Sequence, residues 1–400
     1  MNQTKEPNFD IIASELKKES PRLGDRILLS LILFVASVYL PLAAALPMPP
    51  EAKEAFSFLV CALSVLAQAR LSKKISAGVG HAVLLLLVGF LFGGPYVAAA
   101  LGSLVSVACI FCRLALTTSS LLPIAIPAVA YLTATVAVGS PFLGALSLVG
   151  MPLALFLLLS VRMLLPKVRA LCLISFGIGL SAAVAAILYL LLAHNGISAD
   201  LLREGVEALR ALLTEELELR LSLLEGDVSG LLPLGIGKED YARTLANEII
   251  NHLPAILILL CNAVALVTHS SMVRILLSLK LSKEPLAPVA IFDMSASSAV
   301  VFLVSLILSL VMSGPDSAMA VAVCENLYLI LIPGMLITLW MVLNAFLLAK
   351  APSCFGILLY LALPFLFFQF SSALLPIGAV IGAILILVGK IRKILREKKS

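Results

Sequence analysis

Long apolar segments recur along almost the whole chain, and they constrain its fold more than any other feature. A helix needs roughly 20 apolar residues to cross the ~30 Å hydrocarbon core of a bilayer. Twelve segments of the 400-residue chain approach that pattern. Their ranges are 27–46, 54–69, 78–93, 95–112, 121–138, 141–161, 168–193, 250–273, 288–312, 320–349, 354–370 and 372–390.

The composition supports a membrane protein. The chain is 61% apolar and 13% charged, whereas a typical soluble domain is about 25% charged. A water-soluble globule could not bury that much apolar surface, so a soluble enzyme, a disordered chain and a disulfide scaffold are excluded. The sequence therefore predicts an all-α fold, a polytopic transmembrane bundle of 10–12 spans.

One break in the pattern leaves the number of spans open. Only a Gly-Gly-Pro sequence, Gly93 to Pro95, separates the segments 78–93 and 95–112. Glycine and proline both interrupt helices, so the pair forms either two spans or a re-entrant hairpin of half-helices. Both alternatives leave the flanking segments on the same sides of the membrane.

The charges predict the orientation. With the N-terminus inside and twelve crossings, 22 of the 28 lysines and arginines lie on the inner side, and 15 of the 23 acidic residues lie outside. Positive loops stay in the cytoplasm, so both termini are predicted to be cytoplasmic. The expected organisation is a tail at 1–26, transmembrane blocks at 27–194 and 250–390, an extracytoplasmic segment at 195–249 and a basic tail at 391–400.

The segment 195–249 contains an amphipathic helix. Apolar residues recur at steps of three and four, with acidic and basic residues between them, from near Asp200 to just before Gly226. These apolar residues are Leu202, Val206, Leu209, Leu213, Leu217, Leu221 and Leu224. The polar face is acidic, which argues against binding to anionic lipid. The helix either packs over the outer ends of the bundle or serves as a docking or gating element.

Polar side chains within the spans are the candidate substrate-binding residues, because an ionised group costs about 2.5–3.5 kcal/mol at the centre of a membrane helix. They are Asn262, Asp293, Glu325, Asn326 and Asn344. If its helix begins near residue 317, Glu325 lies about 12 Å inside it, whereas a start at 324 would make Glu325 a helix cap. Asp293 is either a functional carboxylate or an ordinary helix start.

The histidines and cysteines predict no metal or redox site and no cofactor. His81, His194, His252 and His269 have no ligand spacing between them and are expected to be solvated at the membrane interfaces. Cys109 and Cys112 have a redox spacing but lie in an apolar segment, where buried thiols are the simpler interpretation. Gly378 and Gly382 form a GxxxG pair, which predicts close helix contact in the last span.

The chain contains no nucleotide-binding loop, no zinc-protease motif and no serine-hydrolase motif. It is therefore predicted not to be an enzyme and to have no ATPase of its own, and nothing indicates binding to nucleic acid. A small-solute transport or substrate-binding component is the favoured function. A structural or regulatory protein that docks envelope partners through 195–249 is the alternative, and an intramembrane enzyme without a visible catalytic pair is the third class.

Several features of the second half resemble the YybS-like family of bacterial multi-pass membrane proteins. They are the acidic helix, the run from Asn251 to Leu260, Phe292 followed by an acid, and the run that begins at Asn326 and leads to Gly334. The resemblance covers mainly 200–395 and implies a bacterial plasma membrane. The family is in turn similar to the S-components of energy-coupling-factor transporters, which implies a coupling ATPase module as partner. This chain is longer than those components.

Overall fold

The computed structural model describes residues 22–92, 94–117, 121–165, 167–194, 198–223, 237–278, 294–312, 317–350 and 371–397, and within these ranges every regular element is a helix. The first eight elements are α2 (Leu23–Ala45), α3 (Pro50–Ser72), α4 (Ile75–Phe92), α5 (Pro95–Thr117), α6 (Leu122–Val138), α7 (Pro141–Gly144), the 3-10 turn η1 (Ala145–Leu148) and α8 (Gly150–Arg162). They are followed by α9 (Lys167–His194), α10 (Ala199–Leu223), α11 (Lys238–Asn251), α12 (Leu253–Ser278), α13 (Ala296–Val311), α14 (Ala318–Lys350) and α16 (Ser371–Glu397).

Seven stretches of helix in the described part of the chain are long and apolar enough to cross a membrane. They are Leu23–Ala45, Pro50–Ser72, Pro95–Thr117, Ala145–Arg162, Leu253–Ser278, Ala318–Leu343 and Leu375–Arg392. Four shorter apolar helices accompany them: Ile75–Phe90, Leu122–Val138, Arg169–Leu180 and Ala296–Val311. The prediction of an all-helical, multi-pass membrane protein is confirmed, whereas the count of ten to twelve spans stays a prediction. The expected span 354–370 lies outside the described residues.

The described chain forms two compact units. Unit 1 comprises residues 1–196 and 260–286, and unit 2 comprises 197–259 and 287–400. The long helix α12 therefore contributes its first residues to unit 2 and the remainder to unit 1. In this division the amphipathic segment groups with the second half of the chain, and the boundaries of the membrane blocks stay a prediction.

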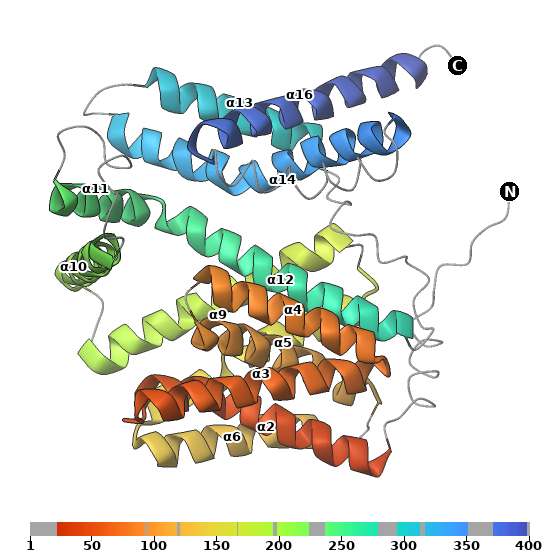
Figure 1. The fold of residues 1–400 in the computed structure, drawn as a ribbon, viewed down its shortest axis with the longest axis vertical. Helices are drawn as coiled ribbons and strands as arrows, with labels where there is room; N and C mark the ends of the chain where they lie inside the picture. Colours follow the sequence, from red (N-terminus) through yellow and green to blue (C-terminus); the bar gives the residue numbers. More distant parts are fainter. Residues whose placement is uncertain are drawn as a thin grey trace, which may run out of the picture. The chain divides into compact units, whose positions relative to one another are not determined.

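Helix α5 is the centre of unit 1 and packs against α2, α3, α4 and α8. Figure 1 shows it beside α3 and α4. Of the 18 most apolar consecutive residues of α5, 78% are buried inside the protein, which is the largest share among the seven spans. Its buried face carries small side chains, which allow neighbouring helices to approach closely. At Gly102, an added Cβ would lie 3.2 Å from the hydroxyl oxygen of Ser64 in α3. Close packing at this point therefore depends on glycine.

The break between α4 and α5 is a tight glycine turn. Gly94 has φ +131°, a conformation that side chains disfavour, and its N–H donates to the carbonyl of Gly89 at 2.8 Å. Helix α5 then begins at Pro95, where a proline loses no hydrogen bond. Since α3, α4 and α5 each pack against the other two, these helices form one three-helix group within unit 1.

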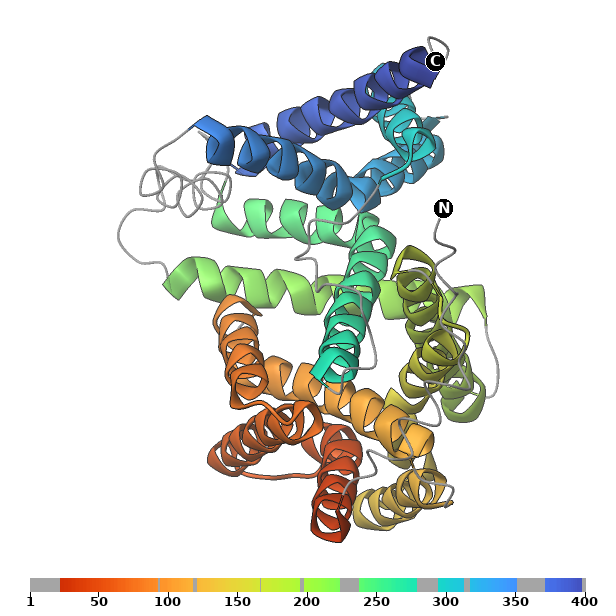
Figure 2. The same ribbon diagram turned by 90° about the vertical axis from the view of Figure 1, so that its right-hand side faces the viewer.

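In unit 2, α13, α14 and α16 pack into a three-helix group, seen from two sides in Figures 1 and 2. Ala299, Phe302, Met335, Ala379 and Ala383 form its buried core. A Cβ added at Gly382 would overlap the backbone carbonyl of Met335. The close helix contact predicted from the GxxxG pair is therefore confirmed at its second glycine.

The predicted amphipathic helix is present as α10, and it packs against α11. Leu209, Leu213, Leu217 and Leu221 are half-buried on one face, as the spacing predicts. Val206, Leu212 and Leu219 are exposed. Helix α10 thus uses part of its apolar surface to pair with α11 and leaves two leucines uncovered on another face.

Candidate functional site

The five polar residues singled out from the sequence are dispersed in the structure. Asp293 lies outside the described residues, and Asn344 lies in α14 in a part whose side chains are not described. Asn262 belongs to unit 1 and has an exposed side chain in α12. Glu325 and Asn326 belong to unit 2. A shared binding cavity for these residues stays a prediction.

Glu325 does not cap its helix. Helix α14 begins at Ala318, so Glu325 is its eighth residue and lies about 10 Å from the start at 1.5 Å per residue. The side chain is half-buried. This position agrees with the alternative in which the carboxyl group lies inside the helix.

Asn326 has a clear structural role. Its Nδ2 donates to the backbone carbonyls of Asn251 at 3.0 Å and Ala322 at 2.8 Å, and its Oδ1 accepts from the N–H of Ala255 at 2.9 Å. Asn251 is the last residue of α11, and Ala255 is in the first turn of α12. The side-chain amide of Asn326 therefore links α14 to the junction between α11 and α12. Both of its N–H donors are used there, which leaves none for a ligand.

The described residues with the most unusual polar environment lie in unit 1, between α3, α4 and α5. His81, Ser64 and Ser106 are buried there, at 3%, 1% and 0% exposure. The hydroxyl of Ser64 lies 2.7 Å from His81 Nε2, 2.8 Å from the Ser106 hydroxyl and 3.0 Å from the Gly102 carbonyl. The expectation that His81 is solvated at an interface is wrong.

Ser64 has one hydroxyl proton for these contacts. When it donates to the Gly102 carbonyl, it accepts from Ser106 and from the N–H of His81. When it donates to His81 Nε2 instead, the imidazole becomes the acceptor. The two arrangements differ by the rotation of one hydroxyl and the tautomer of one histidine, so Ser106, Ser64 and His81 form one continuous hydrogen-bonded chain.

Gln68 extends this group by one turn of α3. Its side chain is 3% exposed, and among the described residues its Nε2 has no hydrogen-bond partner. A buried polar group without a partner costs about 1–3 kcal/mol, so each instance requires an explanation. Cys109, next to it on α5, points its thiol at the Thr268 carbonyl of α12 at 4.0 Å. Ser64, Gln68, His81 and Ser106 are hereafter called the buried polar cluster.

Positive charges flank the buried polar cluster. Arg113, one turn beyond Cys109 on α5, is 3% exposed. Arg274 of α12 comes close to α4, since a Cβ at Gly80 would lie 3.3 Å from its Nη1. His269 of α12 is also buried. The described residues contain no group of three or more His, Cys, Asp or Glu side chains that could hold a metal ion.

The buried polar cluster was missed in the sequence because its serines are small, Gln68 was not singled out and His81 was assigned to an interface. A signal was present: Ser57, Ser64, Gln68 and Ser72 follow each other at helical spacing on one face of α3. The buried, unpaired state predicted for Cys109 and Cys112 is confirmed. Cys172, by contrast, is exposed.

Comparisons with family models, with curated proteins and with solved structures gave no match for this chain.

Proposed function

We propose that this chain is a small-solute transport or substrate-binding component of a membrane, and that the solute binds at the buried polar cluster of unit 1. The observation that carries the proposal is the buried amide of Gln68, whose Nε2 has no hydrogen-bond partner among the described residues other than the weakly accepting thiol of Cys109 beside it. Polar and ionisable groups inside membrane helices commonly mark substrate or proton pathways. A solute that accepts a hydrogen bond would supply the missing partner.

The surrounding charges indicate the chemistry of the solute. Arg274 brings positive charge close to His81 and Gly80 of α4, and Arg113 lies one turn beyond Cys109 on α5. Cations attract anionic or oxygen-rich molecules, and the amide of Gln68 fixes their orientation by a hydrogen bond. A small carboxylic acid fits this combination. The hydrogen-bonded chain through Ser106, Ser64 and His81 offers a route by which protonation could accompany binding.

A binding screen tests this proposal. The purified protein in detergent is heated with a panel of small carboxylic acids and a matching panel of their neutral amides, and the unfolding temperature is recorded. We expect at least one acid to raise the unfolding temperature of the native protein and to have no effect on Gln68→Leu. Ser160→Ala is the matched control, because Ser160 bonds only within α8, to the Leu157 carbonyl at 2.7 Å. A response that persists in Gln68→Leu would contradict the assignment of the site.

ATP-driven transport would require a separate ATPase, because the sequence contains no nucleotide-binding loop. Recovery of the tagged chain from its native membrane in mild detergent, followed by mass spectrometry, should identify a coupling ATPase module if the likeness to energy-coupling-factor S-components holds. We propose in addition that the chain is related to the YybS-like family and lies in a bacterial plasma membrane. Envelope proteins in place of an ATPase would favour the alternative function.

The proposed orientation has both termini in the cytoplasm. Arg70 near the end of α3 and Asp25 near the start of α2 lie 3.7 Å apart, so these two predicted cytoplasmic ends are on the same side of unit 1. A cysteine introduced in the basic tail should react with a membrane-impermeant maleimide only after the cells are opened. Labelling of intact cells would reverse the orientation.

One observation favours docking through 195–249 as a second function. Leu212 and Leu219 of α10 are 64% and 54% exposed, and they lie seven residues apart on one helical face. Such a pair can pack into a groove of a partner protein. Replacing both leucines with glutamine should release that partner in the recovery experiment, whereas Gln68→Leu should retain it.

A further inference from the structure

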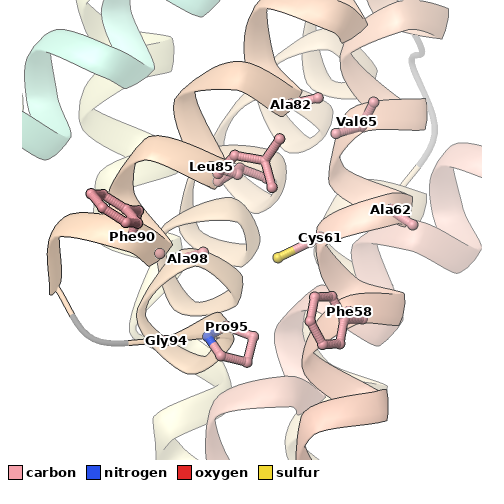
Figure 3. A pocket seen from close by; sticks show the side chains of 12 residues that line it. Phe58, Cys61, Ala62, Val65, Ala82, Leu85, Phe90, Gly94, Pro95 and Ala98 are labelled. Atoms are coloured by element: carbon pink, nitrogen blue, oxygen red, sulfur yellow. The ribbon is translucent and has the colours of Figure 1, made fainter.

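Unit 1 also contains an apolar cavity of about 490 Å³, which lies between α3, α4 and α5 (Figure 3). Phe58, Cys61 and Val65 of α3, Leu85 and Phe90 of α4, and Ala98 of α5 are among the residues that line it. The volume is in the usual range of small-molecule sites, about 300–1,000 Å³. The cavity is separate from the buried polar cluster, because Ser64 and Gln68 are on another face of α3.

The rim of the cavity is exposed and apolar. Phe58, Leu86 and Phe90 are 59%, 72% and 88% exposed. Phe58 is on α3, which is among the seven stretches that can cross a membrane, and Leu86 and Phe90 are on the shorter apolar helix α4, so this rim is suited to hydrocarbon. Apolar cavities do not hold water, because water needs polar partners. The molecules that surround the rim, the acyl chains of lipids, therefore match the lining in chemistry.

The face of α3 that lines the cavity continues to two carboxylates. Glu51, Glu54, Phe58, Cys61 and Val65 follow each other at steps of three and four, so they share one helical face. Glu51 and Glu54 are both exposed. Glu54 thus lies one turn beyond the phenyl ring that ends the cavity on α3, and Glu51 lies about one turn further.

This charged end is the end of the cavity at which the α4–α5 turn lies. Gly94 and Pro95 line the cavity there, and the hydroxyl of Tyr96 donates to the carbonyl of Pro50 at 3.4 Å. The start of α5 therefore lies against the start of α3, next to the carboxylates. Lys53 is on a different face, in line with Ser57 and Ser64. A ligand with an apolar chain and a cationic head group is complementary to this arrangement.

We propose that the cavity binds one acyl chain of phosphatidylethanolamine, with the ammonium of the head group beside Glu54 and Glu51. The chain replaces contacts with bulk lipid by contacts with Cys61, Leu85 and Ala98. The two carboxylates favour the ammonium of phosphatidylethanolamine. They do not favour phosphatidylglycerol, because its glycerol group is uncharged and its phosphate makes the whole lipid negative. This lipid site does not depend on the solute site at Gln68.

Cys61 provides a direct probe, because its sulfur points into the cavity in Figure 3. The full chain is placed in nanodiscs of phosphatidylcholine containing either phosphatidylethanolamine or phosphatidylglycerol and treated with a membrane-permeant maleimide. Labelling is measured by peptide mass spectrometry at Cys61 and, as the reference in the same molecule, at the exposed Cys172. We expect several-fold slower labelling of Cys61 with phosphatidylethanolamine and equal labelling of Cys172. Equal rates at Cys61 in both lipids would overturn the proposal.

Two matched substitutions test the cavity independently. Ala62 lines the cavity, whereas its neighbour Leu59 is 51% exposed and does not line it. Native mass spectrometry of protein extracted from mixed membranes should show one retained phosphatidylethanolamine for the native chain and for Leu59→Phe, and its loss for Ala62→Phe. Equal retention by the two variants would overturn the proposal. A change in the unfolding temperature common to both variants reports on the fold and not on the lipid.

The double variant Glu51→Gln, Glu54→Gln separates the head group from the acyl chain. We expect it to retain a lipid but to lose the preference for phosphatidylethanolamine over phosphatidylglycerol. An unchanged preference would overturn the assignment of the ammonium to these carboxylates. Gln68→Leu is the complementary control, and it should leave lipid retention unchanged even if the solute proposal fails.

Discussion

The side-chain amide of Asn326 donates to the backbone carbonyl of Asn251, 75 positions earlier in the chain, at 3.0 Å. Its oxygen accepts from the N–H of Ala255 at 2.9 Å, on the other side of the joint at His252. The last residue of α11 and the first turn of α12 each leave backbone groups that their own helix cannot satisfy. One side chain of α14 satisfies a group on each side of the joint.

Asn326→Leu should destabilise the joint between α11 and α12. The substitution removes the partners of the exposed Asn251 carbonyl and of the buried Ala255 N–H, and of these two groups the buried N–H is the one whose loss costs about 1–3 kcal/mol. We expect a lower unfolding temperature and faster hydrogen exchange at residues 251–256. Asn326→Asp keeps the acceptor and places a negative charge at the start of α12, where it is favourable, so it should lose less. Equal behaviour of the leucine and aspartate variants would contradict this role.

Gln68→Leu should stabilise the protein in the absence of a ligand. The native side chain is 3% exposed and its Nε2 has no partner among the described residues, so an apolar side chain of similar size removes a cost of about 1–3 kcal/mol. The unfolding temperature in detergent measures the change. Gln68→Ala is the control for packing, and it should be less stable than Gln68→Leu because it leaves a cavity. A destabilised leucine variant would mean that the amide makes a favourable hydrogen bond in the folded protein and would contradict this prediction.

The spans could be predicted from the sequence because apolar length is a local property. The segments 27–46 and 95–112 correspond closely to α2 and α5, and the spacing of leucines located α10 to within a few residues. The prediction was weaker at helix ends, because these depend on turns. Helix α13 begins at Ala296, whereas the span was expected to begin at residue 288. Residues 288–293 lie outside the described part of the chain. Local patterns do not determine which helices touch.

The site was harder to predict, because burial depends on packing between distant helices. His81 was expected to be solvated from its place near the start of an apolar segment, but α3 and α5 cover it. Asn326 was expected to be a candidate substrate-binding residue, whereas two of its three hydrogen-bond partners lie more than 70 residues earlier. In both cases the polar residue was found from the sequence, and its role depended on neighbours that the sequence does not identify.

Gly382→Ala should disrupt the contact between α14 and α16. The added Cβ would overlap the backbone carbonyl of Met335, which cannot move without displacing its helix. We expect a loss of more than about 2 kcal/mol, comparable to severe overpacking. Gly389→Ala in the same helix is the matched control, because nothing lies within 4 Å of its added Cβ. Chemical denaturation of both variants in the same detergent gives the difference, and a similar midpoint for the two would contradict the close contact.

The hydrogen bond between Ser64 and Ser106 should couple α3 to α5 energetically. Each hydroxyl is at most 1% exposed and the oxygens lie 2.8 Å apart, so removing either one leaves the other with fewer partners. A double-mutant cycle of Ser64→Ala and Ser106→Ala should give a coupling energy of about 0.6 kcal/mol, with about 1.7 kcal/mol as the upper end known for membrane helices. The same cycle of Ser64→Ala with Ser160→Ala should be additive, because Ser160 bonds within its own helix.

Since Ser64 also contacts His81 at 2.7 Å, adding His81→Phe should reduce the coupling if the three side chains act as one chain. Strict additivity of all three substitutions would show that the chain is a set of independent contacts and would remove the proposed path for a proton.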